Sequence, residues 1–340
     1  MSALRARPGA VLALGLALVA AAVLASLAIG VIDVPLADVA RVLGDALAGR
    51  DDGSTARTLV VEMRLPRALA AACVGASLGS AGCLLQALLR DPLASPSLIG
   101  TAQAAGFGRV LGVWIGLGFA ASVALSIATA VAGTALVLAI ARTRRGFPSQ
   151  IVLLTGVNVG LLFGALIGLV QYASRDEGQL SRMVIFLLGG LGQVAWTTLA
   201  WTAPFVLGGL VLARLLARRL DLFALGEESA DRLGLATRTS GNVVLVVACA
   251  LTSLAVSVAG VIAFVGLVVP HAARRIVGTD HRVLLPASAA LGALLVLGTD
   301  AVARTAVAPN ELPLGVLTSL VGVPCFLAIL RASARRGGGS

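Results

Sequence analysis

The sequence predicts an all-α, polytopic membrane protein with about ten transmembrane helices and with both termini in the cytoplasm. Its 340 residues are 58% hydrophobic and only 12% charged, and their mean hydropathy is +0.99. A soluble protein cannot bury so much apolar surface, whereas a helical bundle in a bilayer exposes it to lipid. In addition, apolar stretches of roughly 20 residues recur along the chain, and each is long enough to cross the hydrocarbon core.

The predicted membrane spans follow these apolar stretches. They cover about residues 11–31, 67–89, 98–117, 119–140, 151–172, 194–213, 242–259, 261–277, 283–302 and 313–330. The first is expected to be a retained start-transfer helix, because it is long for a signal peptide and further spans follow. Residues 242–269 form one apolar block that is too long for one crossing, so we expect a break at Gly260 and an interruption at Pro270. The patch from Met183 to Leu191 is too short to cross and predicts a surface or re-entrant helix.

The arginines set the predicted orientation. With the N-terminus inside, most of them fall in inner segments, which is the bias that membrane insertion favours. The same orientation places Arg64, Arg67 and Arg304 on the outer face. The net charge is +10, but the arginines are scattered over short loops and form no single basic patch. Membrane topology therefore explains them better than a nucleic-acid partner does.

The chain lacks the usual catalytic motifs. It has two histidines, His271 and His281, and no His-Glu-x-x-His, Gly-x-Ser-x-Gly or P-loop pattern. Its cysteines show no Cys-x-x-Cys spacing and fit small buried apolar positions. We therefore expect that the chain is not an enzyme and holds no cofactor and no metal site, so that any ATP hydrolysis has to come from another chain.

An ion-driven transporter needs an acid within the membrane. Asp300 is the candidate, although it can also pair with Arg304 on the same helix face.

Two inner segments carry further signals. The stretch RDPLASPSLIG, residues 90–100, holds two prolines before a glycine and predicts a tight turn between spans. The longest inner loop covers about residues 221–241. Leu225, Ser229 and Leu233 can share one side of a short helix there, with Glu227 and Glu228 near its start, where acidic side chains are favoured. The alternatives for this loop are a solvated connection or a helix that docks onto a cytoplasmic partner.

Five motifs, taken together, give the chain a specific resemblance. They are RLPR (64–67), LLQ-x(4)-DPLASP (84–96), LGEESA (225–230), FVGLVVPH (264–271) and DHR-x-LLP (280–286). In this order they resemble the permease subunits of ABC importers for ferric siderophores, haem and cobalamin, and the likeness continues through ELPLGVLTSLVGVPCFL (311–327). One departure is Ala263, where the family usually has glycine.

The resemblance implies a way of working. It predicts one permease domain over residues 1–335, followed by a flexible tail at 336–340, in a bacterial cytoplasmic membrane. Two such subunits, identical or related, would form a dimer around a central path. Two ATPase subunits would bind the cytoplasmic face, and a substrate-binding protein would dock outside. Together they would import a metal chelate by alternating access.

The resemblance also assigns roles to residues. Arg64, Arg67 and Arg304 are expected to receive acidic residues of the binding protein, since guanidinium groups suit carboxylates. The alternative is that Arg64 and Arg67 pair with Glu62 or with lipid phosphate. The loop that contacts the ATPase is predicted to use Leu225, Gly226, Glu227, Glu228, Ser229, Ala230, Leu233 and Gly234.

Two polar residues within predicted spans have open roles. Arg109 either lines the transport path, snorkels to the interface, or pairs with a neighbouring helix. Asn158 either joins helices or lines the pore. The main alternative for the whole chain is an autonomous secondary transporter or channel, which would need neither an ATPase nor a binding protein.

Overall fold

A computed structural model of the protein describes residues 8–30, 32–50, 53–141, 149–174 and 176–337, and these residues form helices and connecting segments without strands. The helices are α1 (Pro8–Ala28), α2 (Leu36–Leu47), α3 (Thr55–Arg57), the π-helix η1 (Thr58–Arg64), α4 (Leu65–Leu89), α5 (Thr101–Trp114), α6 (Phe119–Ala141), α7 (Ser149–Ala173), α8 (Glu177–Leu188), α9 (Trp196–Leu215), α10 (Ala217–Phe223), α11 (Glu227–Arg232), α12 (Thr237–Ala259), α13 (Val265–Val277), α14 (His281–Thr305) and α15 (Leu314–Gly337). The predicted all-α class is confirmed.

Each predicted span overlaps one of these helices. Among the described residues, 7 helices are long and apolar enough to cross a membrane. The other predicted spans fall on α5, with 14 residues, on α13, with 13 residues, and on α15, whose apolar part is Leu314–Ala328. A helix rises about 1.5 Å per residue, so α5 and α13 each reach only part of the way across the hydrocarbon core. The total number of spans therefore stays a prediction.

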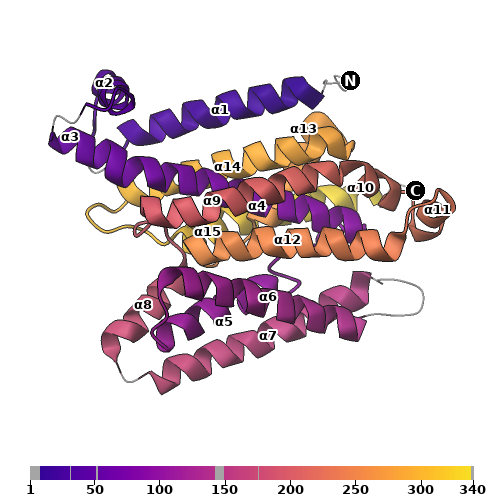
Figure 1. Cartoon of the computed structure of the whole chain (residues 1–340). Helices are drawn as coiled ribbons and strands as arrows, with labels where there is room; N and C mark the ends of the chain where they lie inside the picture. The colour runs from indigo at the N-terminus through magenta and orange to yellow at the C-terminus, as the bar shows by residue number, and fades with distance from the viewer. Residues whose placement is uncertain (1–7, 31, 51–52, 142–148, 175, 338–340) are drawn as a thin grey trace.

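The bundle has two distinct ends. Helices α2 and α3 lie at one end, which we name the α2 end, and α10 and α11 lie at the other, which we name the α11 end (Figure 1). Helix α1 begins and α15 ends at the α11 end. Residues 336 and 337, where the predicted tail begins, are still helical in α15. The membrane side that each end faces remains part of the predicted topology.

Helix α4 is the buried centre of the bundle. It packs against α12, α13 and α14, and 83% of its most apolar segment is buried. Glycines allow its close contact with α14. A Cβ atom on Gly75 would lie 2.1 Å from the Gly292 carbonyl oxygen, and one on Gly79 would lie 2.3 Å from the Ser288 carbonyl oxygen. Small residues at four-residue spacing let the two backbones approach to this distance.

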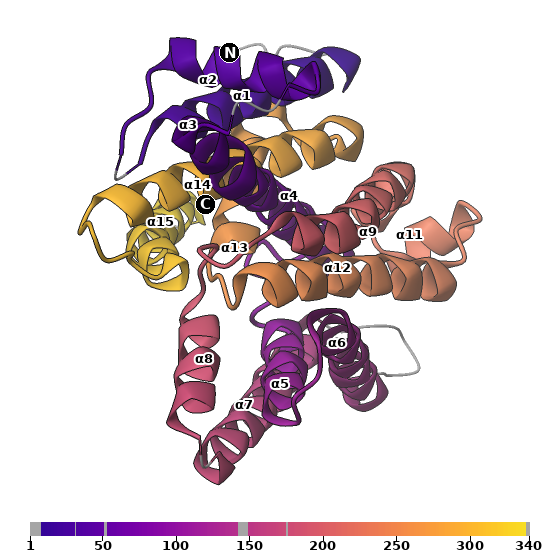
Figure 2. The same ribbon diagram turned by 60° about the vertical axis from the view of Figure 1, so that its left-hand side comes forward.

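Helices α5, α6, α7 and α8 form a second group beside α12. Figure 2 shows this group on one side of α12 and α1, α4 and α14 on the other. Glycines again mark the tight contacts. A Cβ on Gly112 would meet Ser122 of α6 at 2.7 Å, and one on Gly156 would meet Ile99 at 2.6 Å. The turn at 90–100 therefore packs directly against α7, as Gly156 and Gly160 both face it.

The predicted break at Gly260 is confirmed. Gly260 has φ +70° and ends α12, and Phe264, with φ +64°, precedes α13. Neighbouring segments satisfy part of the freed backbone: the Gly190 amide donates to the Ala259 carbonyl at 2.9 Å. Unwound backbone at membrane depth needs such partners within the protein. Ala263 lies in the unwound segment between Gly260 and Phe264. Its φ is not positive, so this position does not require glycine.

Three local expectations are corrected. Helix α13 continues through Pro270, because the chain unwinds before the proline, at residues 260–264. The helix near Met183 starts earlier than the apolar patch, at Glu177, and ends at Leu188 because Gly189 adopts φ +78°. The 221–241 loop contains the end of α10, the short helix α11 and the start of α12. Helix α11 covers only 6 residues, so Leu225 and Leu233 flank it rather than lie on it.

We predict that Gly292→Ala destabilises the fold by about 1–3 kcal/mol, because the new methyl group would force α4 and α14 apart. A Cβ at this position would lie 2.1 Å from the Gly75 carbonyl oxygen. The matched control is Gly298→Ala on the same helix, where a Cβ meets nothing within 4 Å. Replacing this glycine should leave stability unchanged or raise it by about 0.5–1 kcal/mol. Thermal unfolding in detergent measures both variants, and equal midpoints would contradict the close-packing argument.

Candidate functional site

The three arginines predicted to face outward come together at the α2 end. Arg64 is the last residue of η1, Arg67 lies in the first turn of α4, and Arg304 lies in the last turn of α14. All three line one cavity of about 410 Å³, together with Glu62 and Glu311. The contact of α4 with α14 brings the ends of these helices side by side. Positions far apart in the sequence therefore form one basic pocket.

Arg67 is held by two carboxylates. Its Nε and Nη2 donate to Asp300 Oδ1 at 3.0 and 2.9 Å. Its Nη1 and Nη2 donate to Glu311 Oε1 and Oε2 at 2.7 and 2.9 Å. This is a bidentate arrangement on both sides of one guanidinium group, the strongest geometry that arginine offers. The predicted alternative partner, Glu62, is therefore wrong for Arg67.

Asp300 also binds Arg304, as their spacing predicts. Arg304 Nε lies 3.1 Å from Asp300 Oδ2. The pair is not on a solvated helix surface, because the Asp300 side chain is 0% exposed and that of Arg304 is 7% exposed. Arg304 also donates to Ser26 Oγ at 2.8 Å and to the Ile29 carbonyl at 3.1 Å. Asp300 thus neutralises two buried cations, and Arg304 ties α14 to the end of α1.

Arg64 binds backbone oxygens instead of an acid. Its Nη1 donates to the Leu27 and Ala28 carbonyls at 2.7 and 3.2 Å, and its Nη2 donates to the Ile32 carbonyl. These carbonyls lie at and just beyond the C-terminus of α1, where a cation is favoured. Within the part of the chain that the structure describes, no carboxylate forms a salt bridge with Arg64. Arg64 is therefore the arginine of this pocket that forms no salt bridge, and the acid whose charge acts on it is Asp33.

Burial is the main difference from the sequence-based expectation. Arg64, Arg67 and Arg304 are 6%, 9% and 6% exposed, so they do not project freely from the outer face. An acidic group from outside can reach them only through the cavity. Glu311, whose side chain is 45% exposed, lies on the cavity wall beside Arg67. This arrangement can receive a carboxylate at Arg64 without separating Arg67 from Asp300.

The predicted ATPase-contacting residues lie at the α11 end, and most of them are accessible. Leu225 and Leu233 are 59% and 61% exposed. Glu228, Ser229 and Gly234 are exposed as well, Gly226 is half-buried with φ +99°, and the side chain of Glu227 lies outside the described residues. Ala230 is 0% exposed. It therefore anchors α11 to the bundle and is not available to a partner.

One interaction behind this loop has no counterpart among the sequence-based expectations. Asp221 Oδ1 of α10 lies 2.7 Å from His281 Nδ1 and accepts from the His281 backbone amide at 3.1 Å. His281 is the first residue of α14. The signal available in the sequence is the DHR-x-LLP motif, which places a histidine directly at a helix start. The contact fixes α10, and with it the exposed loop, to α14.

Asn158 bonds to no other helix, whereas Arg109 packs against side chains of two neighbouring helices, as one of its three predicted alternatives has it. Asn158 is exposed, and its Nδ2 donates to the Leu154 carbonyl of its own helix at 2.8 Å. It therefore does not join helices within this chain. The Arg109 guanidinium lies 4.8 Å from the centre of the Phe119 ring and 5.8 Å from that of Phe186. Such contacts contribute about 0.5–2 kcal/mol, less than the roughly 2.5–3.5 kcal/mol that a membrane-buried arginine costs.

We predict that Asp300→Ala lowers the free energy of unfolding by about 3–5 kcal/mol, because it leaves Arg67 and Arg304 buried without their shared counter-charge. The control is Asp38→Ala, which breaks the exposed pair with Arg41 (side chains 40% and 69% exposed). Exposed pairs contribute about 0–1 kcal/mol. Thermal unfolding in detergent compares the two variants, and a similar small effect for both would show that the buried network is not structural.

Comparisons with known proteins agree with this geometry. The profile of the FecCD transport family matches residues 18–332. The hemin transport system permease protein HmuU of Yersinia pestis is 39% identical over 82% of this chain and 85% of that protein. The vitamin B12 import system permease protein BtuC of Salmonella typhimurium is 37% identical over 86% of this chain and 88% of that protein.

A solved structure described as an inward-facing conformation of a metal-chelate type ABC transporter has a TM-score of 0.81 at 29% identity, covering 96% of this chain and 99% of that one. The resemblance based on the five motifs is thereby confirmed: the chain belongs to the FecCD transport family and is a multi-pass membrane permease of that family.

Proposed function

We propose that the protein is the transmembrane subunit of an ATP-driven, binding-protein-dependent importer in a bacterial cytoplasmic membrane, and that it moves a metal chelate inward. The names of its relatives support a cargo such as haem or cobalamin, and a ferric siderophore is a further cargo consistent with the family. The observation that carries the proposal is the placement of two different interaction surfaces at opposite ends of one bundle. The α2 end holds the arginine-lined cavity, and the α11 end holds the exposed 225–234 loop.

The cavity at the α2 end suits an acidic side chain of an outer binding protein. Arg64 supplies a positive charge that forms no salt bridge among the described residues, while Arg67 and Arg304 are fixed by Asp300. A carboxylate that enters would form a charge-assisted hydrogen bond in a partly desolvated site, where such bonds are strong. Docking would then weaken as the salt concentration rises.

The loop at the α11 end suits a cytoplasmic ATPase dimer. Leu225 and Leu233 present apolar side chains to solvent, and the acidic Glu228 lies between them. The Asp221–His281 contact connects this loop to α14, which reaches Asp300 and Arg304 at the opposite end. A displacement of α10 and α11 by the ATPase would therefore act on α14, whose last turn lines the arginine-lined cavity.

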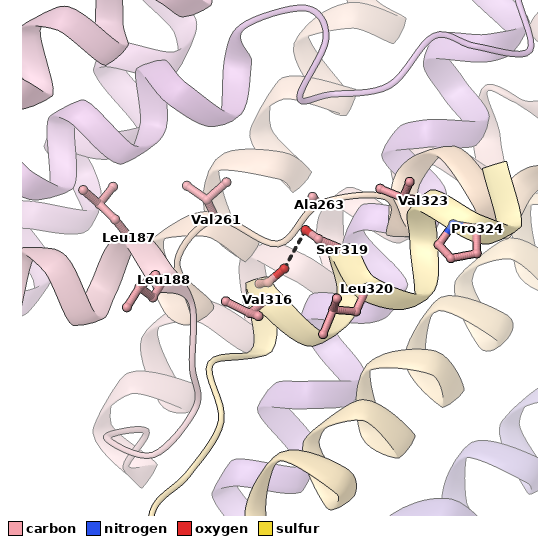
Figure 3. A pocket seen from close by; sticks show the side chains of 10 residues that line it. Leu187, Leu188, Val261, Ala263, Val316, Ser319, Leu320, Val323 and Pro324 are labelled. Atoms are coloured by element: carbon pink, nitrogen blue, oxygen red, sulfur yellow. Dashed lines mark hydrogen bonds between the residues drawn. The ribbon is translucent and has the colours of Figure 1, made fainter. Parts of the chain in front are cut away.

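A second permease subunit suits the remaining apolar surfaces. Helix α15, α8 and the unwound segment before α13 line a groove of about 650 Å³ (Figure 3). Its wall is apolar apart from Ser319, whose hydroxyl donates to the Gly315 carbonyl of its own helix at 2.7 Å. Helix α7 exposes Leu154 and Leu161 beside Asn158. A polar side chain on such a face is accommodated better by a protein partner or a water-filled path than by lipid.

The alternative of an autonomous secondary transporter rests on Asp300 as an ion-coupling acid. In the structure Asp300 is fully buried and bound by both Arg67 and Arg304. Its carboxylate oxygens are already occupied by two guanidinium groups, which leaves no position for a transported ion. We therefore favour the ATP-driven importer. Purification of the tagged chain from its host tests the choice, because the importer requires that an ATPase co-purify.

We predict that Arg64→Gln weakens binding of the outer binding protein by roughly 10–100-fold, since a charge-assisted hydrogen bond contributes about 1.5–3 kcal/mol. The control is Arg41→Gln at the same end, where, unlike the buried Arg64, the arginine is exposed and paired with Asp38. Surface plasmon resonance on the detergent-solubilised complex measures both affinities at low and high salt. An unchanged affinity for a folded Arg64→Gln variant would contradict the docking role.

We also predict that the double change Leu225→Asn and Leu233→Asn abolishes recovery of the ATPase, because it removes two exposed apolar contacts without disturbing buried residues. The control is Leu47→Asn, which alters an even more exposed leucine (91%) at the opposite end. Co-purification and ATPase activity of the complex are the readouts. Full ATPase recovery with the double variant would show that the loop is not the contact surface.

A further inference from the structure

A second cavity at the α2 end lies beside the arginine-lined one. It has a volume of about 560 Å³ and is lined by residues of α5, α6, α8, α9 and α12 and of the segments 189–194 and 311–313. The two cavities share residues 192–194 and Glu311 on their walls. Arg109 of α5 lines this second cavity only. The proposed importer function leaves both the cavity and this arginine without a role.

Arg109 differs from Arg64, Arg67 and Arg304 because each of these has a carbonyl or carboxylate acceptor and Arg109 has none among the described residues. Across the described part of the chain its guanidinium group has neither a hydrogen-bond acceptor nor an ion pair, and its Nε is enclosed without a partner. Its contacts are the faces of Phe119 and Phe186. Aromatic faces attract a cation but leave its N–H donors unsatisfied. The remaining donors open toward the cavity.

The other charged groups on the cavity wall leave the site positive. Glu311 accepts two hydrogen bonds from Arg67, so that arginine already neutralises the charge of Glu311. Arg182 adds a second cation, and the acid within salt-bridge distance of it among the described residues is Asp176 at 3.9 Å, with both side chains more than half exposed. Gln193, Thr198 and Ser257 contribute polar side chains. A negatively charged oxygen-bearing group would therefore satisfy Arg109.

The surroundings favour an amphiphile over a small soluble anion. The same cavity has apolar walls at Ile185, Leu188 and Pro313. Trp114, at the end of α5, and Trp196, at the start of α9, are 40% and 37% exposed at this level of the bundle. Tryptophan gathers at the membrane–water interface, where lipid headgroups lie. Arg109 lies about one and a half turns before Trp114 on the same helix, and an arginine side chain is long enough to reach from there toward the headgroup level.

From these observations we propose that the Arg109 cavity binds the phosphate of a membrane phospholipid, with the guanidinium bound to the phosphate oxygens and the acyl chains following the apolar wall. The bound lipid then fills the space between the α5–α8 group and α12. This inference is independent of the importer proposal, because it requires only that the chain spans a membrane. Under the predicted orientation the lipid belongs to the outer leaflet.

Native mass spectrometry of the full-length, detergent-purified protein tests the site, with phosphatidylglycerol as the added probe. We expect one lipid to bind the wild-type chain tightly and Arg109→Gln to weaken that binding at least tenfold. Arg109→Lys keeps the positive charge but loses the planar fork, so its affinity should be intermediate. Arg41→Gln, which changes an exposed arginine that does not line this cavity, is the control and should change the affinity less than twofold. Equal lipid binding by wild type and Arg109→Gln would overturn the proposal.

A second measurement needs no variant and separates the two sources of phosphate. The thermal midpoint of delipidated wild-type protein should rise when phosphatidylglycerol is added, because a ligand that binds the folded state stabilises it. Inorganic phosphate at the same concentration should leave the midpoint unchanged. If inorganic phosphate raises it equally, the cavity binds free anions and the lipid assignment is wrong. If neither raises it, the cavity is not an anion site.

Discussion

Asp300 accepts hydrogen bonds from Arg67 of α4 and from Arg304 of its own helix, in a position that is fully buried. This interaction closes the α2 end of the bundle. Burying the charges of Asp300, Arg67 and Arg304 costs free energy unless each charge is paired. The ends of α4 and α14 therefore have to stay in register. The glycine contacts between Gly75 and Gly292 impose the same constraint farther along the two helices. The arginine-lined cavity exists because these two helices are fixed side by side.

The same helix pair connects the two functional ends. Helix α14 begins at His281, which holds Asp221 of α10, and ends beside the arginine cavity. The central helix α4 is buried along most of its length and packs on α12, α13 and α14. By contrast, the α5–α8 group contacts this core mainly through α12. The architecture therefore combines a rigid central unit with a more separate group of helices, and the Arg109 cavity lies at their boundary.

Local sequence properties were sufficient for the fold class and most of the helices. Apolar runs of membrane length reveal helices directly, because a backbone in lipid must satisfy its hydrogen bonds within each segment. Gly260 was identifiable as a break for the same reason. The family was recognisable from short motifs such as RLPR and DPLASP, and the ends of the bundle follow from alternating the spans. The spacing of Asp300 and Arg304 also predicted their pairing, since residues four apart share a helix face.

What the sequence alone determined was thus the membrane-length helices, their order, the family and the candidate residues; the short helices α2 and α3 were not predicted. Only the tertiary structure decided how those residues are used. Arg67 meets Asp300 and Glu311 across 233 and 244 residues of chain, and Asp221 meets His281 across 60. No periodic pattern encodes such pairs, because they depend on which helices pack together. The burial of the three arginines and the unpaired state of Arg109 follow from that packing.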